Sequence, residues 1–135
     1  MAEDRILIID DDPSFLEITG AILRRFGYDV LTADNTVEGL RCIETEQPDL
    51  LILDIMMATM DEGLRFAVKL RQNEKLRRLP IIIISAQPDT EKGYSRDLDE
   101  DMDWIAADIF MEKPVDPQAL KENIQLLLSR EQSPR

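Results

Sequence analysis

Short apolar runs alternate along the chain with longer stretches in which apolar residues recur every three or four positions. Such runs are typical of strands buried on both faces of a sheet, and the longer spacing is typical of amphipathic helices. The runs predict five strands, at residues 5–9, 28–33, 49–54, 81–86 and 108–111. The helical spacing predicts helices at 14–26, 36–46, 61–74 and 117–130, and a further helix is expected between the last two strands.

Single residues support several of these boundaries. Pro13 stands where a helix accepts proline in its first turn, and Gly27 is a natural helix stop. Asn35 or Thr36 can cap the second helix, and Pro48 breaks it before the next strand. The pattern therefore alternates strand and helix, beginning with a strand.

Two segments carry no clear pattern. Residues 87–106 include a dense acidic block at 97–103, which is typical of a solvated loop or a weak helix. The last residues, 131–135, resemble a disordered tail. We therefore expect one domain at 1–130, followed by this tail.

The alternation of strands and helices predicts an α/β fold in which helices cover both faces of a parallel sheet. Right-handed crossovers restrict the possible topologies, and the flavodoxin-like strand order 2-1-3-4-5 is a common solution. In that order the ligand crevice lies where the first and third strands meet. These two strands end in Asp10-Asp11 and in Asp54.

Composition excludes several functions. A net charge of −12 disfavours direct binding to nucleic acid or to an anionic membrane, because both need a basic patch. The single cysteine, Cys42, cannot form an internal disulfide and fits a reducing compartment, so we expect a cytoplasmic protein. The chain contains no histidine, which excludes a Ser-His-Asp triad, a histidine-ligated zinc and a phosphohistidine on this chain.

The predicted strand ends bring reactive side chains together. The first strand delivers Asp10 and Asp11, the third Asp54, the fourth Ser85, and the loop after the fifth Lys113. Three carboxylates at one crevice repel each other unless a cation neutralises them, and oxygen ligands without histidine or cysteine favour Mg²⁺. A carboxylate can also attack phosphorus to form an acyl phosphate, while a lysine and a hydroxyl hold the other phosphoryl oxygens.

Together these motifs resemble the receiver domain of bacterial two-component response regulators, of the chemotaxis-regulator type. The resemblance covers roughly residues 5–129. The motifs that carry it are Ile8-Ile9-Asp10-Asp11-Asp12-Pro13, Leu53-Asp54-Ile55-Met56-Met57, Met60-Asp61, Ile84-Ser85-Ala86 and Lys113-Pro114.

The resemblance implies a metal site and a phosphoacceptor. Asp54 resembles the phosphoacceptor and a metal ligand, and Asp11 resembles the direct Mg²⁺ ligand. Asp10 is expected to act mostly through metal-bound water, and the backbone carbonyl of Met56 resembles the remaining protein ligand.

It also implies groups that sense the phosphoryl group. Ser85 resembles the hydroxyl that turns toward it, and Lys113 resembles the lysine that pairs with it, with a cis peptide bond after that lysine. Phe110 stands where the family has its switch aromatic. Met56 and Gln87 stand at the positions that border the approach of water and tune how long the phosphoryl group persists.

The implied function is a signalling module and not an enzyme. It would receive its phosphoryl group from a phosphohistidine of a histidine kinase or histidine phosphotransfer protein, and then switch a surface that binds an unknown downstream protein. Ala58, Glu62 and the long interval from Ser85 to Lys113 depart from the family pattern, so the partner surface is expected to differ. The chain is either a stand-alone receiver or a piece of a longer protein.

Two alternatives remain open. Asp10-Asp11-Asp12 also fits the nucleophile motif of haloacid dehalogenase-like phosphatases, in which Asp10 and not Asp54 would be modified. A receiver fold could also serve as a binding module that is never phosphorylated, although the complete set of three carboxylates, Ser85 and Lys113 counts against this.

Overall fold

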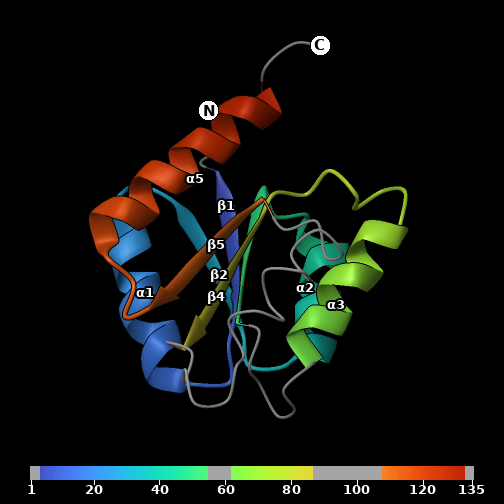
Figure 1. Cartoon of the computed structure of the whole chain (residues 1–135), viewed down its shortest axis with the longest axis horizontal. Coiled ribbons are helices and arrows are strands. Elements are labelled where there is room, and N and C mark those ends of the chain that lie inside the picture. The colour runs from blue at the N-terminus through green and yellow to red at the C-terminus, as the bar shows by residue number, and fades with distance from the viewer. Residues whose placement is uncertain (1–3, 55–61, 87–107, 133–135) are drawn as a thin grey trace, which may run out of the picture.

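The computed structural model describes residues 4–54, 62–86 and 108–132. Five parallel strands form one sheet in the order β2-β1-β3-β4-β5, which confirms the predicted topology (Figure 1). The strands are β1 (Arg5–Ile9), β2 (Asp29–Ala33), β3 (Leu50–Asp54), β4 (Ile81–Ala86) and β5 (Ile109–Lys113). The helices are α1 (Pro13–Arg25), α2 (Thr36–Glu46), α3 (Glu62–Gln72) and α5 (Pro117–Gln132). The helix expected within 87–106 lies outside the described residues.

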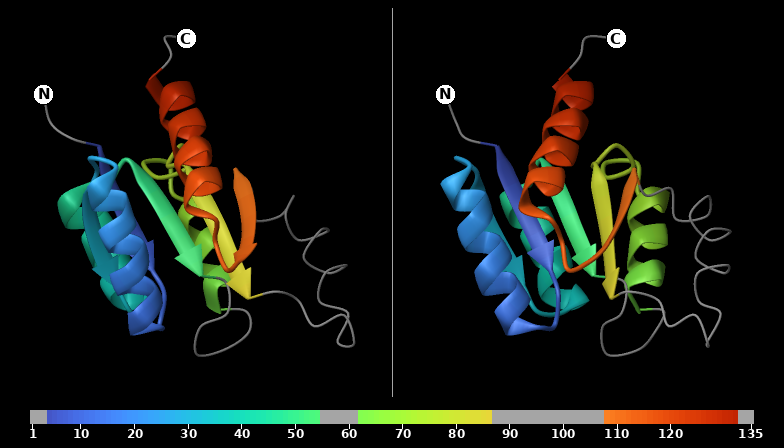
Figure 2. Two further views of the ribbon diagram at one scale, coloured as in Figure 1. Left: turned by 90° about the vertical axis from the view of Figure 1, so that its left-hand side faces the viewer. Right: turned by 60° about the vertical axis from the view of Figure 1, so that its left-hand side comes forward.

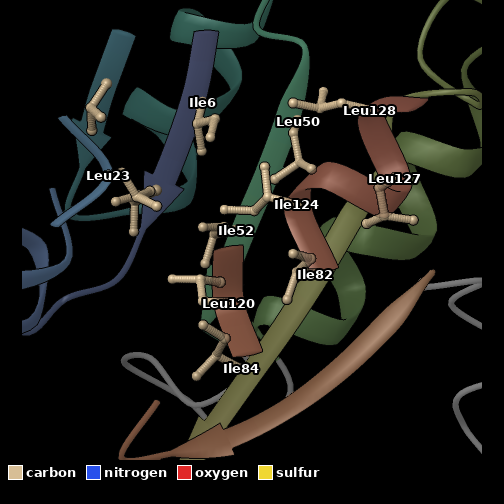
Figure 3. Packing of buried hydrophobic residues seen from close by; sticks show 12 residues of the cluster. Ile6, Leu23, Leu50, Ile52, Ile82, Ile84, Leu120, Ile124, Leu127 and Leu128 are labelled. Atoms are coloured by element: carbon tan, nitrogen blue, oxygen red, sulfur yellow. The ribbon is translucent and has the colours of Figure 1, made fainter. Parts of the chain in front are cut away.

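Helices cover both faces of the sheet, with α1 and α5 on one side and α2 and α3 on the other (Figure 1). Because side chains alternate along a strand, each apolar run contributes residues to the hydrophobic core on each face of the sheet. Ile6, Ile8, Leu50 and Ile52 pack on the side of α1 and α5. Figure 3 shows Leu120 and Ile124 of α5 beside Leu50 and Ile52. The residues between them pack on the side of α2 and α3 (Leu7, Ile9, Leu51, Leu53). The apolar runs are therefore continuous because neither face of the sheet meets water.

The ends of α1 and α2 follow the sequence closely. Asp12 is the N-cap of α1, with Pro13 in the first turn, and Asn35 is the N-cap of α2. Gly27 follows α1 with φ of 98°, a left-handed conformation that favours glycine. These residues confirm the predicted boundaries within one or two positions.

The fifth strand is longer than the sequence suggested. We expected β5 to end at Met111 and Lys113 to lie in the following loop, but Lys113 is the last strand residue and pairs with Ala86 of β4. The apolar pattern stops early because Glu112 is exposed, whereas the ladder of backbone hydrogen bonds continues regardless of the side chain. Lys113 is therefore carried by the sheet itself.

The last helix is also longer than expected. Helix α5 continues through Gln132, so Glu131 and Gln132 are helical and not part of a disordered tail. The remaining residues, 133–135, lie outside the described part of the chain. Within the described ranges, no helix is both long and apolar enough to cross a membrane.

The amino-terminal ends of β1, β2 and β3 meet at what we call the amino edge. There Arg5 contacts three acidic residues: its Nε lies 2.8 Å from Asp29 Oδ2, its Nη1 donates to the carbonyl of Glu46, and its backbone N–H donates to Asp49. The side chain of Arg5 is 39% exposed, and those of Asp29 and Glu46 are 46% exposed. This edge is held by a charged cluster that remains open to water.

Candidate functional site

The carboxyl-terminal ends of the strands meet at the opposite edge, which we call the carboxyl edge (Figure 2). Asp10 follows β1 directly, and its backbone N–H donates to the carbonyl of Ala33 at the end of β2. Asp54 is the last residue of β3, and Ile9 pairs with Leu53 in the ladder between β1 and β3. The register therefore places Asp10 beside Asp54, as the strand order predicted.

Three carboxylates converge at this edge. Each of Asp10, Asp11 and Asp54 offers an oxygen, and these three oxygens lie within 4.8 Å of one another. The side chain of Asp10 is 0% exposed and that of Asp54 is 5% exposed, whereas Asp11 is exposed. Like charges held this close in a buried place repel strongly, so the arrangement favours a bound cation.

Lys113 supplies one positive charge to this group. Its Nζ lies 2.8 Å from Asp10 Oδ2 and 3.9 Å from Asp54 Oδ2, so it is hydrogen-bonded to the first carboxylate and only ion-paired with the second. The same Nζ lies 4.4 Å from the centroid of the Phe15 ring. Three carboxylates and one ammonium leave two formal negative charges (3 − 1), which a divalent cation would neutralise.

The third aspartate of the acidic triplet has a different role. Asp12 Oδ1 accepts a hydrogen bond from Ser14 N at 3.0 Å, which caps α1. The backbone N–H of Asp12 donates to Asp10 Oδ1 at 2.9 Å. Asp12 therefore orients Asp10 and starts the helix, while Asp10 and Asp11 join the carboxylate group.

The remaining predicted site residues are placed less completely. Ser85 lies in β4 and pairs with Glu112, one ladder position before the pair of Ala86 and Lys113, but its side chain is outside the described part. Phe110 lies in β5, partly buried against the core on the side of α2 and α3. Met56 and Gln87 lie outside the described residues. The peptide bond between Lys113 and Pro114 is cis, which confirms the expectation.

This donor set fits Mg²⁺. All three side chains offer carboxylate oxygens, which are the ligands that hard divalent cations prefer. Exposed Asp11 lets water reach the group, and Mg²⁺ usually keeps several waters. The group therefore has the ligand chemistry to hold a divalent cation.

Comparison with known proteins shows the same family from sequence and from structure. The response regulator receiver domain model matches residues 6–125. The chain is 33% identical over 131 residues to the alkaline phosphatase synthesis transcriptional regulatory protein PhoP of Bacillus subtilis, which covers 93% of this chain and 49% of that protein. It is 29% identical to protein PilH of Pseudomonas aeruginosa, covering 93% of this chain and 98% of that protein.

Two solved structures agree. A receiver domain protein from Methanospirillum hungatei is 30% identical, with a TM-score of 0.79 and 96% of each chain covered. The signal receiver domain of a histidine kinase from Syntrophus aciditrophicus is 30% identical, with a TM-score of 0.82 and coverage of 98% of this chain and 95% of that one. The chain spans about half the length of the first curated relatives it matches. The family match, the topology and the carboxyl edge agree that the chain belongs to the response regulator receiver domains of two-component systems.

Proposed function

We propose that Asp54 accepts a phosphoryl group from a phosphohistidine of a histidine kinase or histidine phosphotransfer protein, with Mg²⁺ as cofactor. The modified domain then switches a surface that binds a downstream protein. The observation that carries this proposal is the convergence of three carboxylate oxygens within 4.8 Å, with Lys113 Nζ 3.9 Å from Asp54 Oδ2.

The transfer is a displacement at phosphorus. An oxygen of Asp54 attacks the phosphorus, the bond from phosphorus to the imidazole nitrogen of the partner breaks, and its electron pair stays on that nitrogen. The product is an acyl phosphate on Asp54. Negative charge spreads over the phosphoryl oxygens, and the Lys113 ammonium, whose Nζ lies 3.9 Å from Asp54 Oδ2, would stabilise it.

Asp10 and Asp11 bind the cofactor in this proposal, together with Asp54 and the backbone carbonyl of Met56. Mg²⁺ would supply further neutralisation of the phosphoryl oxygens and of the three carboxylates. Ser85 turns its hydroxyl toward the phosphoryl group and donates a hydrogen bond to it. Phe110, as the switch aromatic, rotates when Ser85 moves.

Hydrolysis limits how long the phosphoryl group persists. In this proposal Met56 and Gln87, which stand at the family positions that border the approach of water, would tune the rate of hydrolysis. Neither a thioether nor an amide is a general base, so hydrolysis is expected to be slow.

The geometry disfavours Asp10 as the modified residue. Its Oδ1 accepts from Asp12 N and its Oδ2 accepts from Lys113 Nζ, at 2.9 and 2.8 Å. An attack through either oxygen of Asp10 would weaken one of these bonds in a fully buried position. These two hydrogen bonds count against the phosphatase alternative, in which Asp10 is the nucleophile.

Intact mass spectrometry after incubation with Mg²⁺ and acetyl phosphate tests the proposal. We expect wild type to gain one phosphoryl group and Asp54→Asn to gain none. Asp49→Asn removes a carboxylate at the amino edge and is expected to label like wild type. A phosphoryl group that persists in Asp54→Asn but disappears in Asp10→Asn would favour the phosphatase alternative, and a wild type that never gains one would favour an unphosphorylated binding module.

A further inference from the structure

Phe15 lies in the first turn of α1, and its ring contacts a charge of the carboxyl edge. Lys113 Nζ lies 4.4 Å from the centroid of this ring. A lysine ammonium within about 6 Å of an aromatic centroid is attracted to the electron-rich face of the ring. Phe15 is partly buried and also packs against the core on the side of α1 and α5, which restricts the movement of the ring.

This contact differs from the other two contacts of Lys113. Asp10 holds the ammonium at 2.8 Å, but its carboxylate also belongs to the group of three that we propose as cation ligands. A carboxylate that is shared with a second cation holds Lys113 less tightly. The Phe15 ring attracts the ammonium without being a metal ligand, so its attraction to Lys113 persists when Asp10 is shared.

The Phe15 ring is also close in sequence to two of the carboxylates of the site. Phe15 follows Asp12 and Pro13, the N-cap and first residue of α1, and the backbone N–H of Asp12 donates to Asp10 Oδ1. Two of the proposed cation ligands, Asp10 and Asp11, and the ring are thus carried by one short segment. Lysine has a long flexible side chain, so a fixed neighbour reduces the number of positions that its ammonium occupies.

We propose that Phe15 is a positioning residue for Lys113, and that its ring face keeps the ammonium beside Asp54 so that the phosphoryl group transfers faster. This inference rests on the proposed function of Asp54. Phe15 itself acts only through Lys113 and not on the phosphoryl group.

The first test needs neither metal nor phosphoryl donor. Protons that lie over the face of an aromatic ring resonate upfield, so the ε-methylene protons of Lys113 are expected upfield of those of other lysines in the metal-free protein. Phe15→Leu is expected to remove this shift. An ordinary Lys113 resonance in wild type would overturn the proposal, because the ammonium would not rest on the ring.

The second test changes the electrons of the ring and keeps its shape. Fluorinated phenylalanines at position 15 withdraw electron density from the ring face while remaining as apolar as phenylalanine. Across a series from unsubstituted to trifluorinated Phe15, we expect the rate of phosphoryl uptake from acetyl phosphate to fall about two- to tenfold. A ring that serves only to fill the core would leave the rate constant across the series.

Two controls separate the contact from general packing. Phe26, also on the side of α1 and α5, lies under a different cation, with Lys121 Nζ 5.1 Å from its centroid, and its fluorination is expected to leave uptake unchanged. In the metal-free protein, the loss of stability caused by fluorinating Phe15 is expected to vanish in a Lys113→Met background. An equal loss in that background would overturn the proposal.

The outcomes also separate this inference from the proposed function. A wild type that takes up no phosphoryl group overturns the proposed function and the inference together. If the wild type takes up the phosphoryl group and every variant fluorinated at Phe15 takes it up at the same rate, the inference alone is overturned.

Discussion

The two edges of the sheet each combine carboxylates with one basic side chain, yet they are built differently. At the amino edge, Arg5 contacts Asp29, Glu46 and Asp49 through separate donor groups. The side chains of Arg5, Asp29 and Glu46 are partly exposed, at 39–46%. At the carboxyl edge, three carboxylate oxygens lie within 4.8 Å of one another, and Lys113 contacts two of the three carboxylates.

The difference shows how the same residue types can either stabilise the fold or form a ligand-binding site. Partly exposed ion pairs around a guanidinium are screened by water, so they hold these strand and helix ends in place at little cost. Carboxylates that face one another in a largely buried place leave negative charge in excess, which a further cation relieves. Both edges combine three carboxylates with one cation, so burial and close spacing, and not formal charge, make the carboxyl edge the one that favours a bound cation.

Removing the basic side chain at each edge gives the largest expected contrast. Lys113→Met leaves Asp10 fully buried without its cation, and we expect a loss of about 3 kcal/mol in the free energy of unfolding of the metal-free protein. Arg5→Met breaks contacts that water replaces, and we expect a loss of about 1 kcal/mol. Urea unfolding of both variants without Mg²⁺ measures the difference, and equal losses would remove the distinction between the edges.

Stabilisation by Mg²⁺ is expected to depend on the carboxyl edge and not on the amino edge. If Mg²⁺ binds the folded carboxyl edge only, it stabilises wild type by about 2.7 kcal/mol at a concentration one hundred times its Kd. Asp11→Asn removes the exposed carboxylate of the group and is expected to abolish most of this gain. The same change at the amino edge, Asp49→Asn, is expected to keep it. Thermal melts with and without Mg²⁺ check this, and an unchanged wild-type Tm would contradict the metal site.

Much of this architecture was predictable from the sequence, because strand burial on both faces shows directly as continuous apolar runs. The runs that end at Ile9 and Asp54 predicted two strand ends, and the order of the sheet brought their carboxylates together. The contact between Phe15 and Lys113 was not predictable in this way. Helical spacing marks Phe15 only as apolar, and its ring meets a lysine far along the chain through tertiary packing alone.

The amino edge was missed for the same reason. Arg5 precedes an apolar run, and nothing near it in the sequence indicates that Asp29 and Asp49 lie beside it. Exposed ion pairs depend on how strands are aligned, which the register fixes only after the fold forms. Lys113 was predicted at the site but assigned to a loop, because side-chain patterns do not report how far an edge strand keeps its backbone ladder.

A substitution in α2 can also disturb the carboxyl edge without changing a charge. A Cβ on Gly39 of α2 would clash with Ile9 Cδ1, and Ile9 is fully buried next to Asp10. We expect Gly39→Ala to cost about 1–2 kcal/mol, because overpacking exceeds the gain in helix propensity. A Cβ on Gly20 of α1 would meet its nearest atoms at 3.6 Å, so Gly20→Ala is expected to stabilise the protein by up to about 1 kcal/mol.

Urea unfolding separates the two alanine variants, and Mg²⁺ adds a second measurement. If Ile9 transmits the disturbance to Asp10, Gly39→Ala gains less from Mg²⁺ than wild type does, whereas Gly20→Ala gains the same. A Gly39→Ala protein that is more stable than wild type would show that Ile9 yields freely.

The smallest expected effect concerns Cys42 of α2, which lies one turn before the acidic side chain of Glu46 at the amino edge. Burial raises the pKa of the Cys42 thiol, Glu38 and Glu46 raise this pKa further, and Arg41 lowers it. The folded state therefore favours the neutral thiol. The contribution of the Cys42 thiol to stability is complete at pH values below its pKa in the unfolded chain. This contribution is lost as the pH rises through the higher pKa of the thiol in the folded state.

Alkylation by iodoacetamide measures this pKa, because the thiolate is the reacting form. The midpoint of the rate profile is expected at a higher pH in the folded protein than in urea. Because Glu46 adds negative charge near the thiol, Glu46→Gln is expected to lower the folded midpoint, and Arg41→Gln is expected to raise it. Asp54→Asn changes the charge at the other edge and is expected to leave it unmoved. A midpoint that followed Asp54 instead of Glu46 would mean that the buried charges of the carboxyl edge reach across the sheet, and the two edges would then not be electrostatically separate.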